Sequence, residues 1–85
     1  MDRIEEEVFE RCFRYLLRRA MRGVSEMELS DRTGISVVTL SQYRNGKTLP
    51  TLKNLRKLAD ALDCTPNDLT WVDEEEMLRL ESLYH

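Results

Sequence analysis

The chain has 85 residues, of which 41% are apolar, and it carries three glycines and two prolines. This length allows one small hydrophobic core and leaves no room for a second. No apolar run approaches the roughly 18 residues of a membrane span, and residues 2–7 lack the basic start and apolar middle of a secretory signal. We therefore expect a cytoplasmic protein that does not contact a membrane.

The net charge is −3, but the charges are unevenly distributed along the chain. Residues 11–25 and residues 35–58 each carry five basic side chains and no acid, while the acids gather at residues 2–10 and 73–81. Attraction to phosphate requires a basic face rather than a basic total, because it acts over only about 8–10 Å. The basic blocks are compatible with a nucleic-acid partner, although such blocks also serve simply to solvate helices.

The first predicted helix covers residues 2–22 and carries two neighbouring apolar stripes. Gly23 is its predicted stop. One stripe contains Ile4, Val8, Cys12 and Leu16, and the other contains Phe9, Phe13, Leu17 and Ala20.

Two short helices follow, and each begins at a serine. Ser25 is a predicted N-cap, and Glu28 completes the spacing of a capping box. That helix should end before Gly34, which can adopt the positive φ that a short turn needs. Ser36 then caps a helix that ends at Gly46.

Three further helices are predicted toward the C-terminus. Thr51 caps a helix through Leu62 with an apolar face, and Thr65-Pro66 opens a short helix that ends near Trp71. Asp73 and Glu76 have capping-box spacing at the start of a last helix, where Val72 and Met77 form a hydrophobic staple. The apolar face of residues 51–62 comprises Leu52, Leu55, Leu58, Ala59 and Leu62. With no strand-like alternation, the predicted fold class is all-α.

The helix over residues 36–45 has two different faces. One face collects Ile35, Thr39, Leu40 and Tyr43, which suit a core; the other collects Val37, Val38, Ser41, Gln42 and Asn45. Two adjacent valines on an exposed face are hard to explain in water, but in a major groove they would meet thymine methyl groups. Gln42 could pair with an adenine and Ser41 with a base edge or a phosphate. Alternatively, the valines pack on the C-terminal helix or on a partner chain.

Polar groups that could bind phosphate lie at the neighbouring helix ends. Their side chains or free N–H groups would fix the register on a duplex without reading its sequence. Each could instead be an ordinary solvated cap. The candidates are Ser25, Asn45, Lys47, Thr48 and Thr51.

The segments SEMEL, TGIS, QYRNGKTLP and TLKNLRKLADALDCTPNDL, within residues 24–69, resemble the phage-repressor and Cro-type (XRE-like) helix-turn-helix family. The resemblance implies a five-helix lambda-repressor-like domain that binds double-stranded DNA as a transcriptional regulator, usually a repressor, and usually as a homodimer on a two-fold operator. It places Val37, Val38 and Gln42 at base-reading positions and Ser25, Asn45 and Lys47 at phosphate-contacting positions.

Two positions depart from the family pattern. Glu26 stands where the family commonly has glutamine, and Arg44 stands where it favours a glutamate that pairs with an arginine of the first helix, here Arg19. Both residues are therefore expected to lie near DNA, without an assigned role. Glu26 could turn toward an arginine or read a cytosine, and Arg44 could face a phosphate or another acid.

The expected organisation is an N-terminal helix over residues 1–23, a helix-turn-helix core over 24–70 and a helical extension over 71–85. The extension could form a dimer interface, or its apolar stripe could fold back on its own domain and cover Trp71. Both alternatives are compatible with the sequence.

Other functional classes find little support in the sequence. The single histidine, His85, is the last residue, and Cys12 and Cys64 lack metal-ligand spacing, so we predict no enzyme, no metal site, no cofactor and no small-molecule ligand. The two cysteines are expected to be small core side chains. The main rival is a protein-interaction module, such as an antitoxin with weak or autoregulatory DNA binding.

Overall fold

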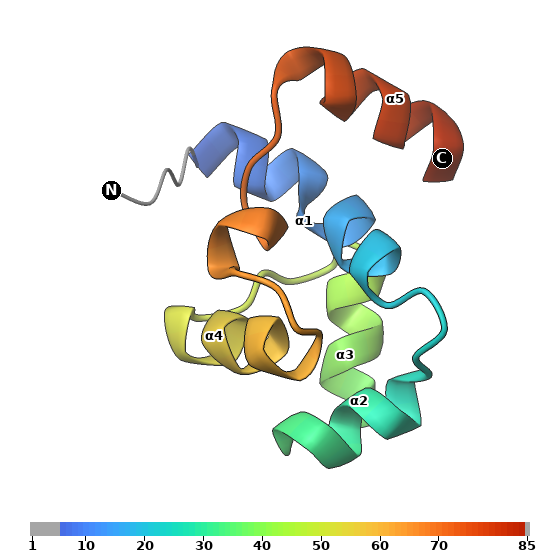
Figure 1. Cartoon of the computed structure of the whole chain (residues 1–85), viewed down its shortest axis with the longest axis vertical. Coiled ribbons are helices and arrows are strands. Elements are labelled where there is room, and N and C mark those ends of the chain that lie inside the picture. Colours follow the sequence, from blue (N-terminus) through green and yellow to red (C-terminus); the bar gives the residue numbers. More distant parts are fainter. Residues whose placement is uncertain (1–5, 85) are drawn as a thin grey trace.

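The computed structural model describes residues 6–84, and within that range it is helical with no strand (Figure 1). The predicted all-α class is therefore confirmed, while Asp2–Glu5, including Ile4, and His85 lie outside the described residues. The elements are α1 (Glu6–Ala20), α2 (Glu26–Thr33), α3 (Val37–Arg44), α4 (Leu52–Ala61), the 3-10 helix η1 (Pro66–Leu69) and α5 (Glu74–Tyr84).

The two apolar stripes of α1 pack into two different clusters. Phe13 and Leu17 lie in the larger cluster, together with Leu29 of α2, Leu40 of α3 and Leu58 of α4. The other stripe supplies Cys12 and Leu16 to a smaller cluster, whose remaining buried members are Tyr15, Val72, Met77 and Leu80. Helix α1 therefore separates the α2–α4 core on one side from α5 on the other.

The predicted serine caps of α2 and α3 are present. Ser25 Oγ accepts from the Glu28 N–H at 3.0 Å, and Ser36 Oγ accepts from the Thr39 N–H at 3.1 Å. Gly34 ends α2 with a φ of 76°, as the turn requires. A full capping box would also have the Glu28 carboxylate accept from the Ser25 N–H. That part of the prediction was wrong, because the Glu28 carboxylate binds Arg32 on the next turn of the helix instead.

Two details differ toward the middle of the chain. Leu52 was placed with the apolar face of α4, but its side chain is 53% exposed because it is the first residue of the helix and lies beyond the core. The segment after Thr65-Pro66 is a 3-10 helix, closed by a reciprocal capping box between Thr65 and Asp68. In a segment of one turn, the two hydrogen bonds between Thr65 and Asp68 favour the tighter 3-10 helix over an α-helix.

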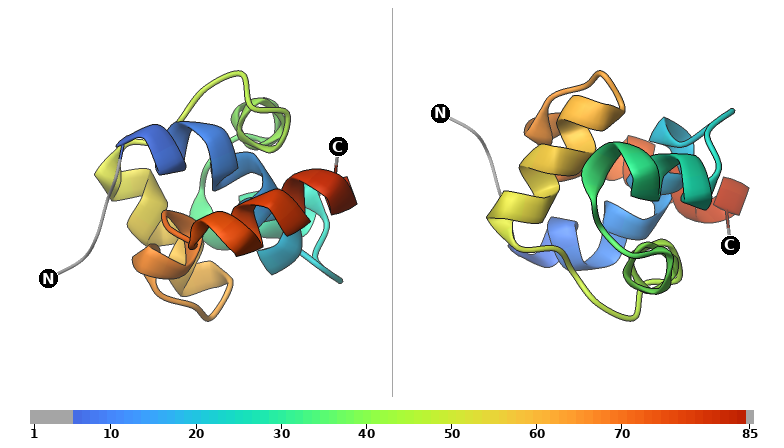
Figure 2. Two further views of the ribbon diagram at one scale, coloured as in Figure 1. Left: turned by 90° about the horizontal axis from the view of Figure 1, so that it is seen from above. Right: turned by 90° about the horizontal axis from the view of Figure 1, so that it is seen from below.

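Helix α5 folds back across α1, at the end of the molecule opposite α2 (Figures 1 and 2). Met77 and Leu80 are buried in the smaller cluster, while Leu78 and Leu83 remain exposed on the outer surface. Within the single chain, the apolar stripe of α5 folds back on its own domain, and Trp71 is half-buried.

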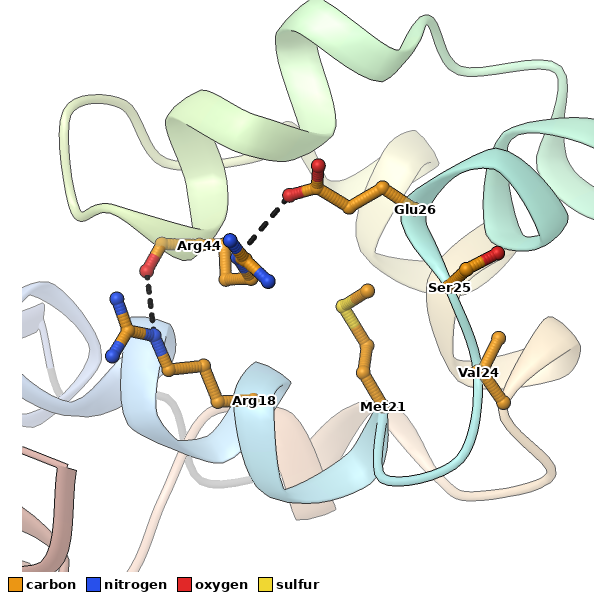
Figure 3. A pocket seen from close by; sticks show the side chains of 6 residues that line it. All are labelled: Arg18, Met21, Val24, Ser25, Glu26 and Arg44. Atoms are coloured by element: carbon orange, nitrogen blue, oxygen red, sulfur yellow. Dashed lines mark hydrogen bonds and ion pairs between the residues drawn. The ribbon is translucent and has the colours of Figure 1, made fainter.

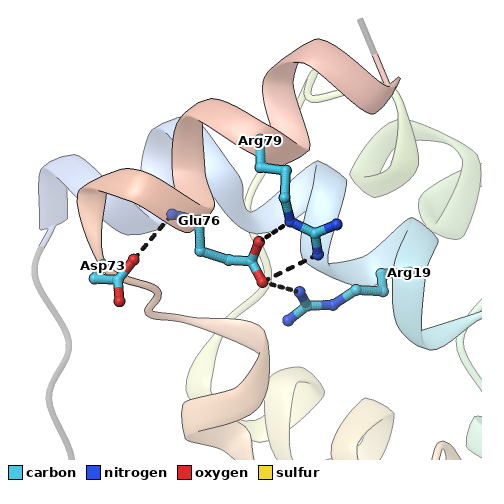
Figure 4. A network of polar contacts seen from close by, with 4 residues as sticks. All are labelled: Arg19, Asp73, Glu76 and Arg79. Atoms are coloured by element: carbon cyan, nitrogen blue, oxygen red, sulfur yellow. Dashed lines mark hydrogen bonds and ion pairs between the residues drawn. The ribbon is translucent and has the colours of Figure 1, made fainter.

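Ion pairs reinforce the packing of α5 on α1. Arg11 donates two hydrogen bonds to the Glu81 carboxylate, at 2.8 and 2.7 Å. Arg19 and Arg79 both donate to the Glu76 carboxylate, and the Glu76 N–H donates to Asp73 (Figure 4). The hydrogen bond from Arg79, assisted by the charge of Arg19, lowers the pKa of Glu76 below its usual value. The carboxylate of Glu76 therefore accepts from these arginines instead of from the Asp73 N–H, as the predicted capping box would require.

Neither cysteine forms a disulfide. Cys12 is buried against α5, Cys64 is half-buried against the larger cluster, and burial raises the pKa of both thiols. Both are therefore core side chains, as expected. Within residues 6–84 no helix is long and apolar enough to cross a membrane.

Candidate nucleic-acid interface

Helix α3 presents one buried face and one exposed face. Leu40 and Tyr43 are buried, and the Tyr43 hydroxyl accepts a hydrogen bond from Asn54 of α4 at 3.0 Å. Phe13 of α1 also packs edge-on against the Tyr43 ring. These contacts fix the rotation of α3 about its axis, and so decide which side chains face outward.

The outward face contains the residues predicted to read bases. Val38 is 69% exposed and Val37 is 39% exposed, while Ser41 and Gln42 are half-buried beside them. Helix α5 packs on α1 and does not cover the valines. Within one chain, the alternative that Val37 and Val38 pack on the C-terminal helix is therefore wrong.

The predicted phosphate-contacting residues are all exposed, and they lie at helix ends or in the loop that follows α3. Ser25 and Thr51 are the N-caps of α2 and α4, and Asn45 follows the last residue of α3. The Lys47 N–H donates to the Gln42 carbonyl at 2.9 Å, which holds the start of the connecting loop against α3. Thr48 lies further along the same exposed loop.

The start of α2 and the end of α3 meet at a solvent-open hollow of about 360 Å³ (Figure 3). Here Arg44 Nε lies 3.1 Å from Glu26 Oε2. This carboxylate oxygen is buried and has no hydrogen bond among the described residues, so the contact is an ion pair without a hydrogen bond. The hollow is lined by Arg18, Met21, Val24, Ser25, Glu26 and Arg44.

The two positions that depart from the family pattern are therefore partners. Sequence spacing left Glu26 and Arg44 without assigned roles, whereas the structure pairs their opposite charges. The arginine of α1 beside Arg44 is Arg18, whose Nε donates to the Arg44 carbonyl at 3.2 Å. Arg19, the arginine expected there, binds Glu76 of α5 instead.

Sequence reasoning missed three residues around this surface. Met27, at the second position of α2, is 72% exposed, and its place off the Leu29 side of the helix is the signal that could have shown this. Arg14 lies beneath Gly46, where an added Cβ would come within 2.7 Å of Arg14 Cδ. The positions of Arg14 and Arg18 depend on tertiary packing, for which the local sequence offers no signal.

The comparisons with known proteins agree with this geometry. A helix-turn-helix family model matches residues 16–69, which begin inside α1 and end with η1. The chain belongs to the XRE-type helix-turn-helix family. The resemblance drawn from its sequence is thereby confirmed.

Two curated relatives of this helix-turn-helix protein are similar over most of the domain. The cryptic phage CTXphi transcriptional repressor RstR of Vibrio cholerae serotype O1 is 36% identical over 64 residues, covering 69% of this chain and 57% of RstR. The uncharacterized HTH-type transcriptional regulator YozG of Bacillus subtilis is 41% identical over 51 residues, covering 59% of this chain and 61% of YozG. The chain thus spans less than two thirds of the length of either relative. No solved structure matches it.

Proposed function

We propose that this helix-turn-helix protein is a sequence-specific regulator of transcription that inserts α3 into the major groove of double-stranded DNA. The observation that carries the proposal is the outward face of α3, where Val37 and Val38 are exposed to solvent and are not covered by α5. A helix of this diameter fits the major groove, and an exposed apolar pair gains contact area there.

Base readout is assigned to the four residues of this face. Val37 and Val38 suit thymine methyl groups, and the amide of Gln42 suits the N6 and N7 atoms of an adenine. Ser41 can bond to a base edge or to a phosphate. The face carries no arginine or lysine, the side chains that most often read guanine. The preferred site should therefore be rich in A·T pairs at the positions that these side chains reach.

Register on the duplex is assigned to the polar residues around α3. The ammonium group of Lys47 attracts phosphate, and the free N–H groups at the starts of α2 and α4, beside Ser25 and Thr51, favour anions. Asn45 and Thr48 supply neutral hydrogen-bonding groups from the loop. Since the Arg44 guanidinium compensates Glu26, the start of α2 does not present an isolated carboxylate to the DNA backbone.

We further propose that the protein acts in the cytoplasm as a homodimeric repressor on a two-fold operator. RstR is named a transcriptional repressor, which supports repression as the outcome. A two-fold protein implies a palindromic site whose half-sites lie about one helical turn apart. We assign the part of the chain up to residue 23, with α1, to support of the domain, residues 24–70 to DNA binding, and the extension from residue 71 to a dimer contact through the exposed Leu78.

Selection of bound sequences from a pool of random duplexes tests this proposal. We expect a palindromic A·T-rich site, with an affinity that falls steeply between about 50 and 200 mM salt because several phosphates are neutralised. Recovery of no preferred sequence would overturn the proposal. In that case binding to a protein partner that is insensitive to salt would identify an interaction module, for which exposed Met27 and Val38 are equally suitable.

A further inference from the structure

The guanidinium of Arg18 lies where two helices end. Its Nε donates to the carbonyl of Arg44, the last residue of α3, at 3.2 Å. One terminal nitrogen donates to the carbonyl of Tyr84, the last residue of α5, at 3.4 Å, and the other approaches Asn45 Oδ1 at 3.5 Å. A single side chain of α1 therefore touches the C-terminal ends of both α3 and α5.

This arrangement has a clear physical basis. The last carbonyls of a helix have no partner within the helix and carry its partial negative charge. A guanidinium offers five N–H donors in a rigid planar fork and stays charged, so it can bind two such ends at once. Arg18 is half-buried, and its contact with Tyr84 is partly buried, whereas its contacts with Arg44 and Asn45 lie at the surface.

The contacts of Arg18 reach the proposed DNA-binding surface. Asn45 also donates from Nδ2 to Ser41 Oγ at 3.4 Å, so Arg18 and α3 hold its amide from two sides. The side chain of Arg44 continues to Glu26 at the start of α2. A displacement of α5 at Tyr84 would thus change the position of Asn45 and of the loop that follows it.

We infer that Arg18 is a positioning residue that couples the placement of α5 to the DNA affinity of α3. The effect on DNA affinity rests on the proposed function, whereas the structural coupling between α5 and the end of α3 does not. The inference assigns α5 a role in DNA binding, although this helix lies at the far end of the molecule from α2 (Figure 1).

A double-mutant cycle on the full chain tests the coupling. Leu83→Gly loosens the last turn of α5, which carries the Tyr84 carbonyl, and removes little packing because Leu83 is 59% exposed. Arg18→Gln removes the guanidinium that contacts the C-terminal ends of both α3 and α5. The matched background is Arg11→Gln, which removes the same charge from α1 and also breaks a contact with α5, the pair with Glu81, but does not touch α3.

The first readout is the affinity for the palindromic duplex that the wild type selects. Leu83→Gly should weaken binding about threefold in the wild-type and Arg11→Gln backgrounds and leave it unchanged in the Arg18→Gln background. Arg18→Lys, which keeps the charge but not the fork, should recover only part of the coupling. An equal effect of Leu83→Gly in all three backgrounds, or no effect in any, would overturn the inference.

The second readout needs no DNA. In amide NMR spectra of the free protein, Leu83→Gly should shift the resonances of residues 45–47 in the wild type and in Arg11→Gln, but not in Arg18→Gln. If neither the wild type nor any variant binds a preferred duplex, the proposed function is wrong. The spectra still show whether Arg18 couples α5 to residues 45–47. Unchanged resonances at residues 45–47 in the wild-type background would disprove it.

Discussion

Glu26 and Arg44 form an ion pair across the helix-turn-helix, with 3.1 Å between Oε2 of the glutamate and Nε of the arginine (Figure 3). The pair joins the first residue of α2 to the last residue of α3. It places one negative and one positive charge at the edge of the proposed DNA surface, so the two charges should act on DNA in opposite directions.

Removing either charge should therefore change DNA affinity in opposite senses. Glu26→Gln leaves Arg44 free to attract phosphate, and we expect tighter binding to every duplex, with a salt dependence steeper by about one unit of log–log slope. Arg44→Gln leaves the Glu26 carboxylate uncompensated, and should weaken binding to all sequences. Titrations across a salt series measure both effects.

A selective effect would point to another role for Glu26. If Glu26→Gln weakened binding and relaxed the preference at a single G·C pair, Glu26 would be reading the cytosine amino group rather than serving Arg44. The double variant Glu26→Gln/Arg44→Gln, which has the same net charge as the wild type, is the matched control for charge alone.

The separation of base readout from phosphate contact gives a second prediction. Gln42→Ala should cost about 1–3 kcal/mol of binding to the selected site and relax the preference at one or two base pairs. Lys47→Ala should weaken binding to all sequences alike and lower the salt slope by about one. Repeating the site selection with each variant distinguishes them, and identical behaviour of the two would contradict the assignment of the α3 faces.

The local features of this fold were predictable from sequence because they depend on contacts between near neighbours. The caps at Ser25, Ser36 and Thr51 each bind an N–H three residues away, and the turn glycine at Gly34 has the positive φ expected of it. The exposure of Val37 and Val38 followed from helical periodicity. Such features need no knowledge of the tertiary structure.

Several of the remaining errors come from ion pairs that compete with the predicted capping bonds. Glu76 has capping-box spacing with Asp73, yet its carboxylate is drawn to Arg79 and to Arg19 of α1. Likewise, periodicity cannot tell which arginine of α1 reaches the end of α3, because that depends on the angle at which α1 crosses it. The ion pair of Glu26 and Arg44 joins residues 18 positions apart, and was therefore visible only in the structure.

Two glycines with similar backbone angles give a third prediction. Gly46 and Gly34 have φ of 73° and 76°, so alanine at either position is strained, by about 1–2 kcal/mol. A Cβ at Gly34 meets nothing within 4 Å, but at Gly46 it would lie 2.7 Å from Arg14 Cδ and 2.8 Å from a terminal nitrogen. Gly46→Ala should therefore lower the free energy of unfolding by about 1 kcal/mol more than Gly34→Ala, as measured by urea denaturation.

The contact with Arg14 can be isolated by a second substitution. Relative to Arg14→Ala alone, adding Gly46→Ala should cost no more than Gly34→Ala does in the wild type, because the clashing side chain is gone. An unchanged extra cost would place the strain in the backbone of the loop and not against Arg14.

The ion pairs of α5 lead to a prediction about pH (Figure 4). Because Arg79 and Arg19 lower the pKa of Glu76 in the folded chain, the ionised carboxylate stabilises the fold at pH values above the glutamate pKa of the unfolded chain, about 4.3. This contribution is lost as the pH falls through the lower pKa of the folded state. Glu76→Gln should thus lower the melting temperature slightly at pH 7, and the difference from the wild type should vanish in acid.

Glu75→Gln is the matched control, since it removes the same charge from the same first turn of α5. It retains the hydrogen bonds from Arg19 and Arg79 to Glu76, and removes only the weaker interactions of a surface carboxylate with the helix dipole and with Arg79 one turn along the helix. We therefore expect a smaller loss at pH 7 for Glu75→Gln in thermal unfolding followed by circular dichroism. Equal losses for the two variants would show that the arginines do not stabilise α5 through Glu76.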